Sequence, residues 1–434
     1  MSLARIIRWR QGKHSRNRFG YCSYAYPEMS STTELSTLSP SRYAIEIRDK
    51  DFRLKDRLEN AVTGLQFEWN RIGGCGRCTF TIEGSYLRVT VAPDDDIRVY
   101  LPNESSGATL WYRGYVESVT PAIESGNDGS IRVECQGYFG WMERIIIHNS
   151  GAKKTYTNTE VSLIVQDIID NFIVPNSSIT RGTINASTFI PDTMEFKMTA
   201  KEALRTCYDL LGEVEYGINA SLQFYWYTQS ESLTDKFYLG GAVTKISDRV
   251  DFKRIVNKIY FEGGDSGGSA YTTTGTAQDS IDRFGLHEEI ISNAAIVTNS
   301  VANRFISGTF TQRARPQRQL GVTLKNITKR FESSLPIGAI SIVDPDVAQA
   351  RFLWGRTANG GSNLIYGVSA NSGSGKVYGG VRKEQIDRIM YSVSPQDGRI
   401  DAEINFGSSV AVSRASATIK EIEHIQNTLR QRSL

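Results

Sequence analysis

The chain has 434 residues, which leaves room for about three domains of roughly 150 residues each. Its 50 Lys and Arg residues nearly balance its 47 Asp and Glu residues, and the net charge of +3 excludes a protein that attracts nucleic acid through a strong overall positive field. Apolar residues at 40% and charged residues at 22% exclude wholesale disorder. No uncharged apolar run reaches the roughly 18 residues of a membrane-spanning helix, so we expect no stable membrane insertion.

Residues 1–40 form a predicted N-terminal arm. A basic stretch from Arg5 to Arg18 precedes a Ser/Thr-rich stretch from Ser30 to Ser41, and neither has apolar periodicity or the h-region of a signal peptide. We expect the arm to be solvated, and contact of its basic residues with phosphate is the alternative. Met29 is an alternative start of the protein.

Residues 41–150 form a predicted first β domain. Apolar and polar residues alternate there with period two, which is typical of strands that bury one face. Turn signals such as Gly73-Gly74 separate the runs, and about seven antiparallel strands in this length predict a barrel or sandwich. The apolar runs are Tyr43–Ile47, Leu65–Trp69, Leu87–Val91, Ile97–Leu101 and Ile131–Cys135, and their polar partners are Glu46, Gln66, Glu68, Arg88, Arg98, Arg132, Glu134 and Gln136.

Residues 151–245 form a predicted smaller α+β domain. The apolar residues of Val161–Phe172 fall on one helical face. A second helix begins with a capping box formed by Thr199 and Glu202, and it ends at Gly212. Two strands are predicted to follow, at Val214–Ile218 and Leu222–Tyr227.

Period two returns in residues 246–411, which form a predicted second β domain. A short helix is predicted at about Ala294–Ile306, and the glycine-rich segments Gly263–Gly275 and Gly367–Gly380 are predicted surface loops. Residues 412–434 form a predicted C-terminal helix, which either packs on its own chain or joins a short coiled coil with neighbouring copies. The predicted strands lie within Ile255–Phe261, Val322–Leu324, Ile340–Ile342, Ile389–Val393 and Ile400–Phe406.

Five scattered cysteines do not form a disulfide framework. Cys75 and Cys78 form one C-x-x-C pair, but no second pair or nearby His completes a four-ligand zinc site. We expect Cys78 to be a small buried residue of a strand, with a metal site as the alternative.

Gly264–Gly268 resembles the segment around the nucleophile of chymotrypsin-like serine proteases. That mechanism needs a histidine base, and the histidines that precede the segment, His14 and His148, lack the setting of one. Ser269 stands where the family has proline. We therefore predict a flexible loop.

Two further segments are weak candidates for ligand binding. Ser374–Lys376 resembles the end of a phosphate-binding loop, but Ala370 replaces its first glycine and Val377 its final Ser or Thr. Asp94–Asp96 has the chemistry to hold a hard cation, although three acids after a proline are expected to form a solvated turn. We predict no catalytic residue, no cofactor and no metal ligand, and the paired carboxylates of a glycosidase remain an alternative.

Several segments, taken in order, resemble the hub proteins of bacteriophage tail tips and baseplates. The resemblance spans roughly residues 41–407. The segments are Phe67–Gly76 with its Gly-Gly-Cys-Gly turn, Cys78–Ile82, Trp111–Val116, Val133–Tyr138, Asp279–Gly285 with Phe284 where the family has Tyr, Arg388–Tyr391, and Phe406-Gly407.

The resemblance implies two barrel-like domains related to tail-tube subunits, with residues 151–245 outside them. It implies a homotrimer, in which six barrels form a ring that joins a three-fold tip to a six-fold tube, and a structural role without enzyme activity. The implied partners are the tail tube and distal tail proteins, the tape measure protein, tip or fibre proteins, and transiently the passing DNA. The implied location is the virion tail tip, after synthesis in the host cytoplasm.

Because a lumen lined with Lys and Arg would hold DNA through its phosphates, we expect a neutral or acidic lumen. Two alternatives remain. One is a tail-associated cell-wall or polysaccharide hydrolase, which requires a carboxylate pair in a cleft. The other is a carbohydrate-binding tip module that uses Trp226 or Trp354, although we expect both tryptophans to pack inside sheets.

Overall fold

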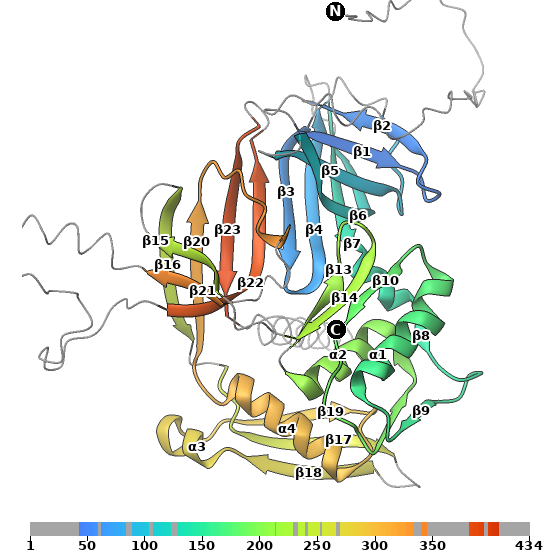
Figure 1. Ribbon diagram of the computed structural model, residues 1–434, viewed down its shortest axis with the longest axis vertical. Helices are drawn as coiled ribbons and strands as arrows, with labels where there is room; N and C mark the ends of the chain where they lie inside the picture. Colours follow the sequence, from blue (N-terminus) through green and yellow to red (C-terminus); the bar gives the residue numbers. More distant parts are fainter. Residues whose placement is uncertain are drawn as a thin grey trace, which may run out of the picture. The chain divides into compact units, whose positions relative to one another are not determined.

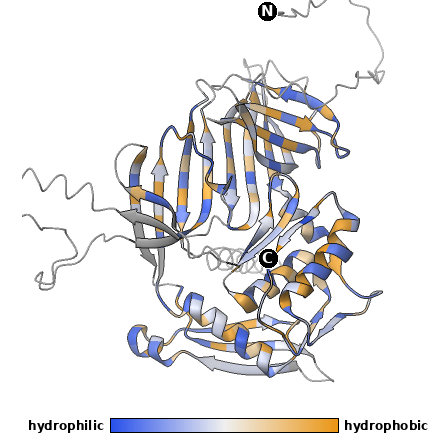
Figure 2. Cartoon of the chain, in the orientation of Figure 1, coloured by the Kyte–Doolittle hydropathy of each residue, from blue (hydrophilic) through white to orange (hydrophobic). Residues whose placement is uncertain are grey.

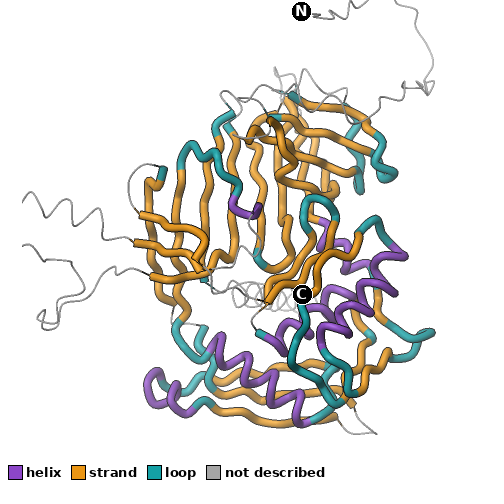
Figure 3. Tube along the Cα trace, in the orientation of Figure 1, coloured by secondary structure: helices purple, strands orange, loops and turns teal. Residues whose placement is uncertain are grey.

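The computed structural model describes residues 43–59, 62–83, 89–103, 107–122, 129–212, 214–228, 233–238, 242–251, 254–265, 270–333, 340–344, 382–394 and 398–407. All of them lie in Leu38–Leu434, one of the two units into which contacts divide the chain. They are mostly strands with a smaller helical part (Figure 3). The predicted mainly β architecture with an α+β part is confirmed.

Eight strands form a continuous run in the order β6-β7-β4-β3-β22-β23-β20-β16 (Figure 1). Every neighbouring pair in this run is antiparallel. The pairing of β22 with β3, which places Arg388 opposite Asn70, joins the two period-two regions of the chain in one sheet. The strands are β3 (Val62–Asn70), β4 (Ile72–Glu83), β6 (Gly107–Ala122), β7 (Ser130–Gly137), β16 (Val243–Asp251), β20 (Gln317–Leu324), β22 (Arg382–Val393) and β23 (Ile400–Phe406).

Other strands extend this sheet at three places. The first half of β6 pairs with β5 (Asp96–Asn103), which is followed by β1 (Ala44–Arg48) and β2 (Leu54–Leu58). The start of β22 pairs with β21 (Ile340–Asp344), which pairs with β15 (Leu233–Tyr238). The start of β4 pairs with β13 (Val214–Ile218), and β14 (Gln223–Thr228) and β10 (Thr180–Ile184) continue from it.

The α+β part contains both helices predicted there. α1 (Val161–Ile168) continues into a π-helical turn at Ile169–Ile173 and a 3-10 turn at Val174–Asn176. α2 (Ala200–Leu211) begins with the predicted capping box, in which the Thr199 side chain accepts from the N–H of Glu202, and it ends at Gly212 with a φ of 77°. Smaller elements nearby are the 3-10 helix η3 (Tyr138–Arg144) and the strand pairs β8 (Ile146–Ile147) with β12 (Met198–Thr199) and β9 (Lys154–Thr157) with β11 (Thr193–Phe196).

A three-stranded sheet in the order β18-β17-β19 carries two further helices. The predicted helix at about Ala294–Ile306 is wrong in its position, because α4 begins at Asn299. The side chain of Asn293 accepts from the N–H of Ala295 and forms a turn instead. The elements are β17 (Lys258–Asp265), β18 (Ala270–Thr276), α3 (Gln278–Phe284), β19 (Glu288–Asn293) and α4 (Asn299–Arg313), and a 3-10 turn, η6, follows at Phe331–Ser333.

Two other local predictions are wrong. Most of the predicted loop Gly263–Gly275 belongs to β17 and β18, which pair along their length because the threonines of β18 favour an extended backbone. The described end of the predicted strand Leu87–Val91 is not a strand, because the Asp95 carboxylate accepts the N–H of Ala92 and turns the chain there. The arm of residues 1–40, the loop Gly367–Gly380 and the C-terminal helix lie outside the described residues.

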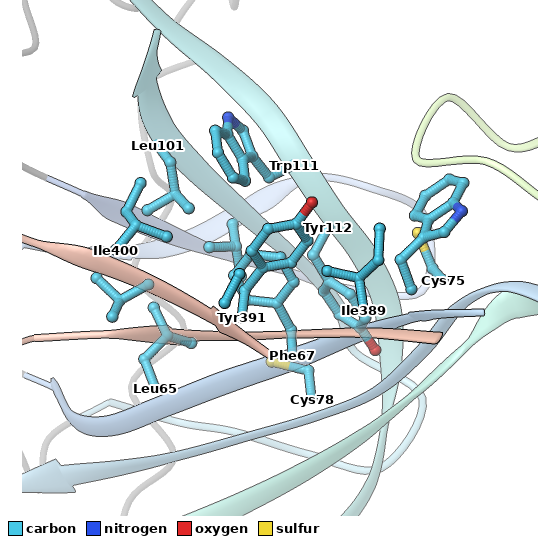
Figure 4. Packing of buried hydrophobic residues seen from close by; sticks show 14 of the residues in the cluster. Leu65, Phe67, Cys75, Cys78, Leu101, Trp111, Tyr112, Ile389, Tyr391 and Ile400 are labelled. Carbon is cyan, nitrogen blue, oxygen red and sulfur yellow. The ribbon is translucent and has the colours of Figure 1, made fainter. Parts of the chain in front are cut away.

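Two clusters of buried side chains hold the fold together. The first contains apolar residues of β1–β7 together with those of β20, β22 and β23, so both period-two regions share one core. Figure 4 shows its centre, where the ring centroid of Phe67 lies 5.8 Å from that of Tyr112 and 5.1 Å from that of Tyr391. The second cluster joins α1, α2 and β13 to β17 and α4. The predicted domain boundaries near residues 150, 245 and 411 stay predictions.

Candidate functional site

The candidate site is the polar face of the eight-strand run, which lies opposite the first core. Side chains alternate along these strands between buried apolar and accessible polar ones, as Figure 2 shows by alternating colours. We call the accessible side the polar face. Its described charged side chains are Glu68, Arg77, Glu83, Glu117, Arg132, Glu134, Lys245, Arg388, Asp401 and Glu403.

Charges on the polar face are paired across strands. Glu134 of β7 accepts from Arg77 of β4 at 2.7 Å and lies 3.2 Å from Arg132. The hydrogen bond from Arg77 holds the pKa of the Glu134 carboxyl below its usual range. These contacts keep the carboxylate charged near neutral pH and leave little excess of either sign around it.

The same pairing crosses the junction of the two β regions. Arg388 of β22 lies 3.1 Å from Glu68 of β3. Farther along the run, Asp401 of β23 accepts from Lys325, just beyond the end of β20, at 2.6 Å. Among the side chains that the structure describes on these strands, six carboxylates therefore meet four cations, with Lys325 as a fifth cation at the margin. The described part of the polar face is near neutral and slightly acidic.

The Gly-Gly-Cys-Gly turn lets β13 approach the start of β4. Gly73 pairs with Gly217 and Gly74 with Ile218 in parallel register. A Cβ on Gly74 would lie 2.2 Å from the Ile218 carbonyl oxygen, and one on Gly217 would lie 2.3 Å from the Gly74 nitrogen. The Gly-Gly-Cys-Gly turn thus joins the eight-strand run to the α+β part.

Comparisons with known proteins find no matching family model and no matching curated protein. Among solved structures, the 43 kDa tail protein of prophage MuSo2 from Shewanella oneidensis is 15% identical with a TM-score of 0.54, and the match covers 86% of this chain and 99% of that one. The tail protein of Neisseria meningitidis MC58 is 10% identical with a TM-score of 0.52, and the match covers 84% and 96%.

This chain has a phage tail-protein fold. The similarity extends over nearly the whole length of both known proteins, so it includes both the eight-strand run and the α+β part of this chain. The resemblance inferred from short sequence segments is thereby confirmed at the level of fold.

Within this tail-protein fold, the four cysteines that the structure describes are core residues. Cys78 and Cys135 are register partners on β4 and β7, and both are fully buried beside Tyr112. Burial raises the pKa of the Cys75 thiol to about 12, which keeps it protonated and a poor metal ligand. No group of three potential metal ligands occurs among the residues the structure describes. The expectation that Cys78 is a small buried residue is confirmed.

The prediction of a solvated turn at Asp94–Asp96 is wrong for its last two residues. Asp96 is fully buried, and its carboxylate lies 2.7 Å from both Arg98 and Arg113. Tyr138 also donates to it, at 2.8 Å. Lys55 contacts Asp95 at 2.6 Å, so protein cations already occupy the carboxylates that a metal would need.

The remaining candidates are not brought together. Trp226 is buried against Tyr216, as expected, and cannot bind a carbohydrate at the surface. Asp265 ends β17, while Ser266–Gly268, Ser374–Lys376 and Trp354 lie outside the described residues. None of the described helices is long and apolar enough to cross a membrane.

Two functional features were missed by sequence reasoning. The polar positions of the alternation, including Glu68, Arg132 and Glu134, were visible, but nothing local indicated that β22 would add Arg388 to them. A buried group beneath the face was also missed: Tyr391 donates to Glu332, which Arg330 contacts at 2.7 Å. Burial, followed by the negative Glu332, raises the pKa of Tyr391 well above its usual range.

Proposed function

We propose that this protein is a structural component of a phage tail tip or baseplate, in which three copies form a hub ring whose polar faces line a DNA channel. The observation that carries this proposal is the eight-strand antiparallel run with one buried face and one near-neutral polar face. The tail-protein fold supports the coarser part, a tail component, and the following steps support the ring.

The direction of the strands allows copies of the run to join edge to edge. Copies related by an axis that runs along the strands keep the same strand direction, so β16 of one copy would lie next to β6 of the next copy. β16 and β6 are antiparallel, since they are the first and last of eight strands that alternate in direction. An even number of strands lets the antiparallel pattern continue from copy to copy without interruption.

The two end strands of the run, β16 and β6, have edges that could pair with another copy. In the described part of the chain, β16 pairs with β20 alone, and β6 from Glu117 to Ala122 pairs with β7 alone. Ile246 on β16 and Val119 on β6 are partly buried against the core, while Lys245, Ser247 and Thr120 belong to the polar face. Pairing of these edges would extend both the apolar and the polar layer, and it would remove two edges that invite aggregation.

The width of a DNA duplex determines how many copies the ring needs. Strands about 4.8 Å apart and tilted by about 40° make a barrel of 16 strands about 32 Å wide between backbones and one of 24 strands about 48 Å wide. Side chains of the inner face remove about 10 Å. The bore is then about 22 Å wide for two copies and about 38 Å wide for three. Since B-DNA is about 20 Å wide, two copies leave almost no clearance, whereas three copies leave ample room.

The balanced charge of the polar face would let DNA pass without strong binding. Each unpaired Lys or Arg that contacts a phosphate would add salt-dependent affinity and slow the DNA. The cross-strand pairs of the polar face avoid that excess. In this proposal the protein is not an enzyme, its location is the virion, and its partners are the tail tube, distal tail, tape measure and tip proteins.

Cysteine cross-linking tests the ring at its edges. A variant with Cys22→Ser, Thr120→Cys and Ser247→Cys carries one new thiol on each edge, while the native cysteines of the described region are buried. A short bis-maleimide should convert it into covalent trimers. A matched variant with Cys22→Ser, Thr120→Cys and Ser392→Cys places the second thiol in the middle of the run and should give no trimers. A stable monomer at micromolar concentration in native mass spectrometry and electron microscopy would contradict the proposal.

A further inference from the structure

We propose that a cavity between α3 and the end of α4 is a docking site for an acidic peptide segment, contributed by another protein, that places an aromatic or large aliphatic side chain beside its carboxylate. The cavity has a volume of about 750 Å³. That size lies in the range of ligand pockets. The lining residues on which the inference depends are Asp279, Ser280, Arg283, Phe284, Phe310 and Arg315.

The walls of the cavity are tied together by buried hydrogen bonds. Ser280 of α3 donates to the carbonyl of Ala314 at the end of α4. Asn257, which is fully buried, donates to the Gly285 carbonyl at 2.7 Å and accepts from the N–H of His287 at 2.7 Å. The two sides therefore hold a fixed spacing, which lowers the entropic cost of binding.

The segment Asp279–Gly285, one of those that resemble tail-tip hub proteins, contains two sets of residues with different roles. Ser280 makes a buried hydrogen bond, and Gly285 adopts a φ of 81° that ends α3. Asp279, Arg283 and Phe284 belong to neither core cluster and line the cavity instead. The roles of Ser280 and Gly285 are explained by folding, whereas Asp279, Arg283 and Phe284 would serve binding.

The charge of the cavity selects an anion. Arg283 and Arg315 are exposed and form no ion pair with any residue that the structure describes, whereas the nearby Arg313 pairs with Glu289. Among the described lining residues, Asp279 supplies the single carboxylate. Two free guanidinium groups are suited to bidentate binding of a carboxylate.

The aromatic part of the cavity selects an apolar group next to that carboxylate. Phe284 and Phe310 are partly buried, and Phe310 also packs on the second core, so it offers a firm apolar surface. A side chain that covers both rings would remove apolar area from water at about 25 cal/mol per Å². An inorganic anion would use the arginines and leave this surface exposed.

A random hexapeptide library screened on the full-length protein tests the inference. We expect enrichment of peptides with Asp or Glu next to an aromatic or large aliphatic residue. Arg283→Glu with Arg315→Glu should lower that enrichment at least tenfold. The control Lys197→Glu with Lys236→Glu makes the same charge change at exposed sites outside the cavity and should leave the enrichment unchanged.

Two outcomes would overturn the inference. One is the absence of acidic peptides from the enriched set, and the other is displacement of the peptides by millimolar phosphate or acetate, which would indicate a general anion site. The docking site does not require the ring: trimers without peptide enrichment would refute the docking site alone, and monomers that still bind these peptides would refute the ring alone.

Discussion

Gly74 and Gly217 determine how closely β13 approaches β4, and their effect is local enough to test with one substitution. Gly74→Ala adds a Cβ that would lie 2.2 Å from the Ile218 carbonyl oxygen, at a φ of 74°. We expect it to lower the free energy of unfolding by at least about 3 kcal/mol, the sum of a left-handed backbone penalty and a steric clash with backbone. Urea unfolding measures the loss.

Gly64→Ala is the matched control. Gly64 also has a positive φ, of 63°, but a Cβ there would meet nothing within 4 Å. It should therefore lose only the backbone term, about 1–2 kcal/mol. Equal losses in the two variants would show that the approach of β13 does not constrain Gly74.

At the residue scale, burial was predictable where it followed a local pattern. Cys78 and Trp226 lie inside, as their positions in apolar runs indicated. Asp96 does not follow such a pattern. Its partners Arg113 and Tyr138 come from β6 and η3, and only their assembly around the carboxylate makes its burial favourable. From the sequence alone, the three consecutive acids Asp94–Asp96 are expected to be exposed to solvent.

At the element scale, α2 is the clearest case in which local sequence defines a structure. Its capping box satisfies two backbone N–H groups at the helix start, those of Thr199 and Glu202. Thr199→Ala should lower the free energy of unfolding by about 1 kcal/mol, while Thr199→Ser, which keeps the hydroxyl, should lower it by much less. Thermal unfolding measures both, and similar losses in both variants would mean that methyl packing, not capping, is what Thr199 supplies.

α4 is an element whose boundaries could not be read locally. The apolar residues Ala295–Val297 suggested a helix, but Ala295 and Ile296 pack in the second core from a turn, and the helix starts beyond them. β17 and β18 show the same limit, because their glycines resemble a loop until the strands pair. In both cases the deciding interactions are tertiary.

At the scale of the whole molecule, the testable quantity is the charge balance of the polar face. Replacing Glu68, Glu134 and Glu403 by Lys would make that face strongly positive in every copy. We expect at least tenfold tighter binding of a short DNA duplex at low salt, with a steep loss of affinity as salt rises. Fluorescence anisotropy at several salt concentrations measures the effect.

The control makes the same substitutions at ion-paired glutamates outside the eight-strand run, the exposed Glu143 and Glu288 and the partly exposed Glu195. These changes should alter duplex binding much less, because the three positions lie outside the polar face. Equal tightening in both variants would mean that net charge alone decides binding, and the polar face would lose its special role.

The alternation of each strand was predictable, whereas the order of the strands was not. Nothing within Val62–Asn70 or Arg382–Val393 indicates that they pair, because sheet partners are chosen by the packing of a shared core. The candidate site follows the same rule: its residues were visible one strand at a time, and the face they form required the whole sheet.

The pairing of β22 with β3 also has a consequence for synthesis. At 5–20 residues per second, a ribosome makes β22 some tens of seconds after β3 has emerged, and during that time one side of β3 has no partner. A nascent chain therefore carries an open strand for most of its translation, which favours chaperone contact. Prematurely terminated chains that lack β22 would keep this defect, with the edge of β3 open to non-native pairing.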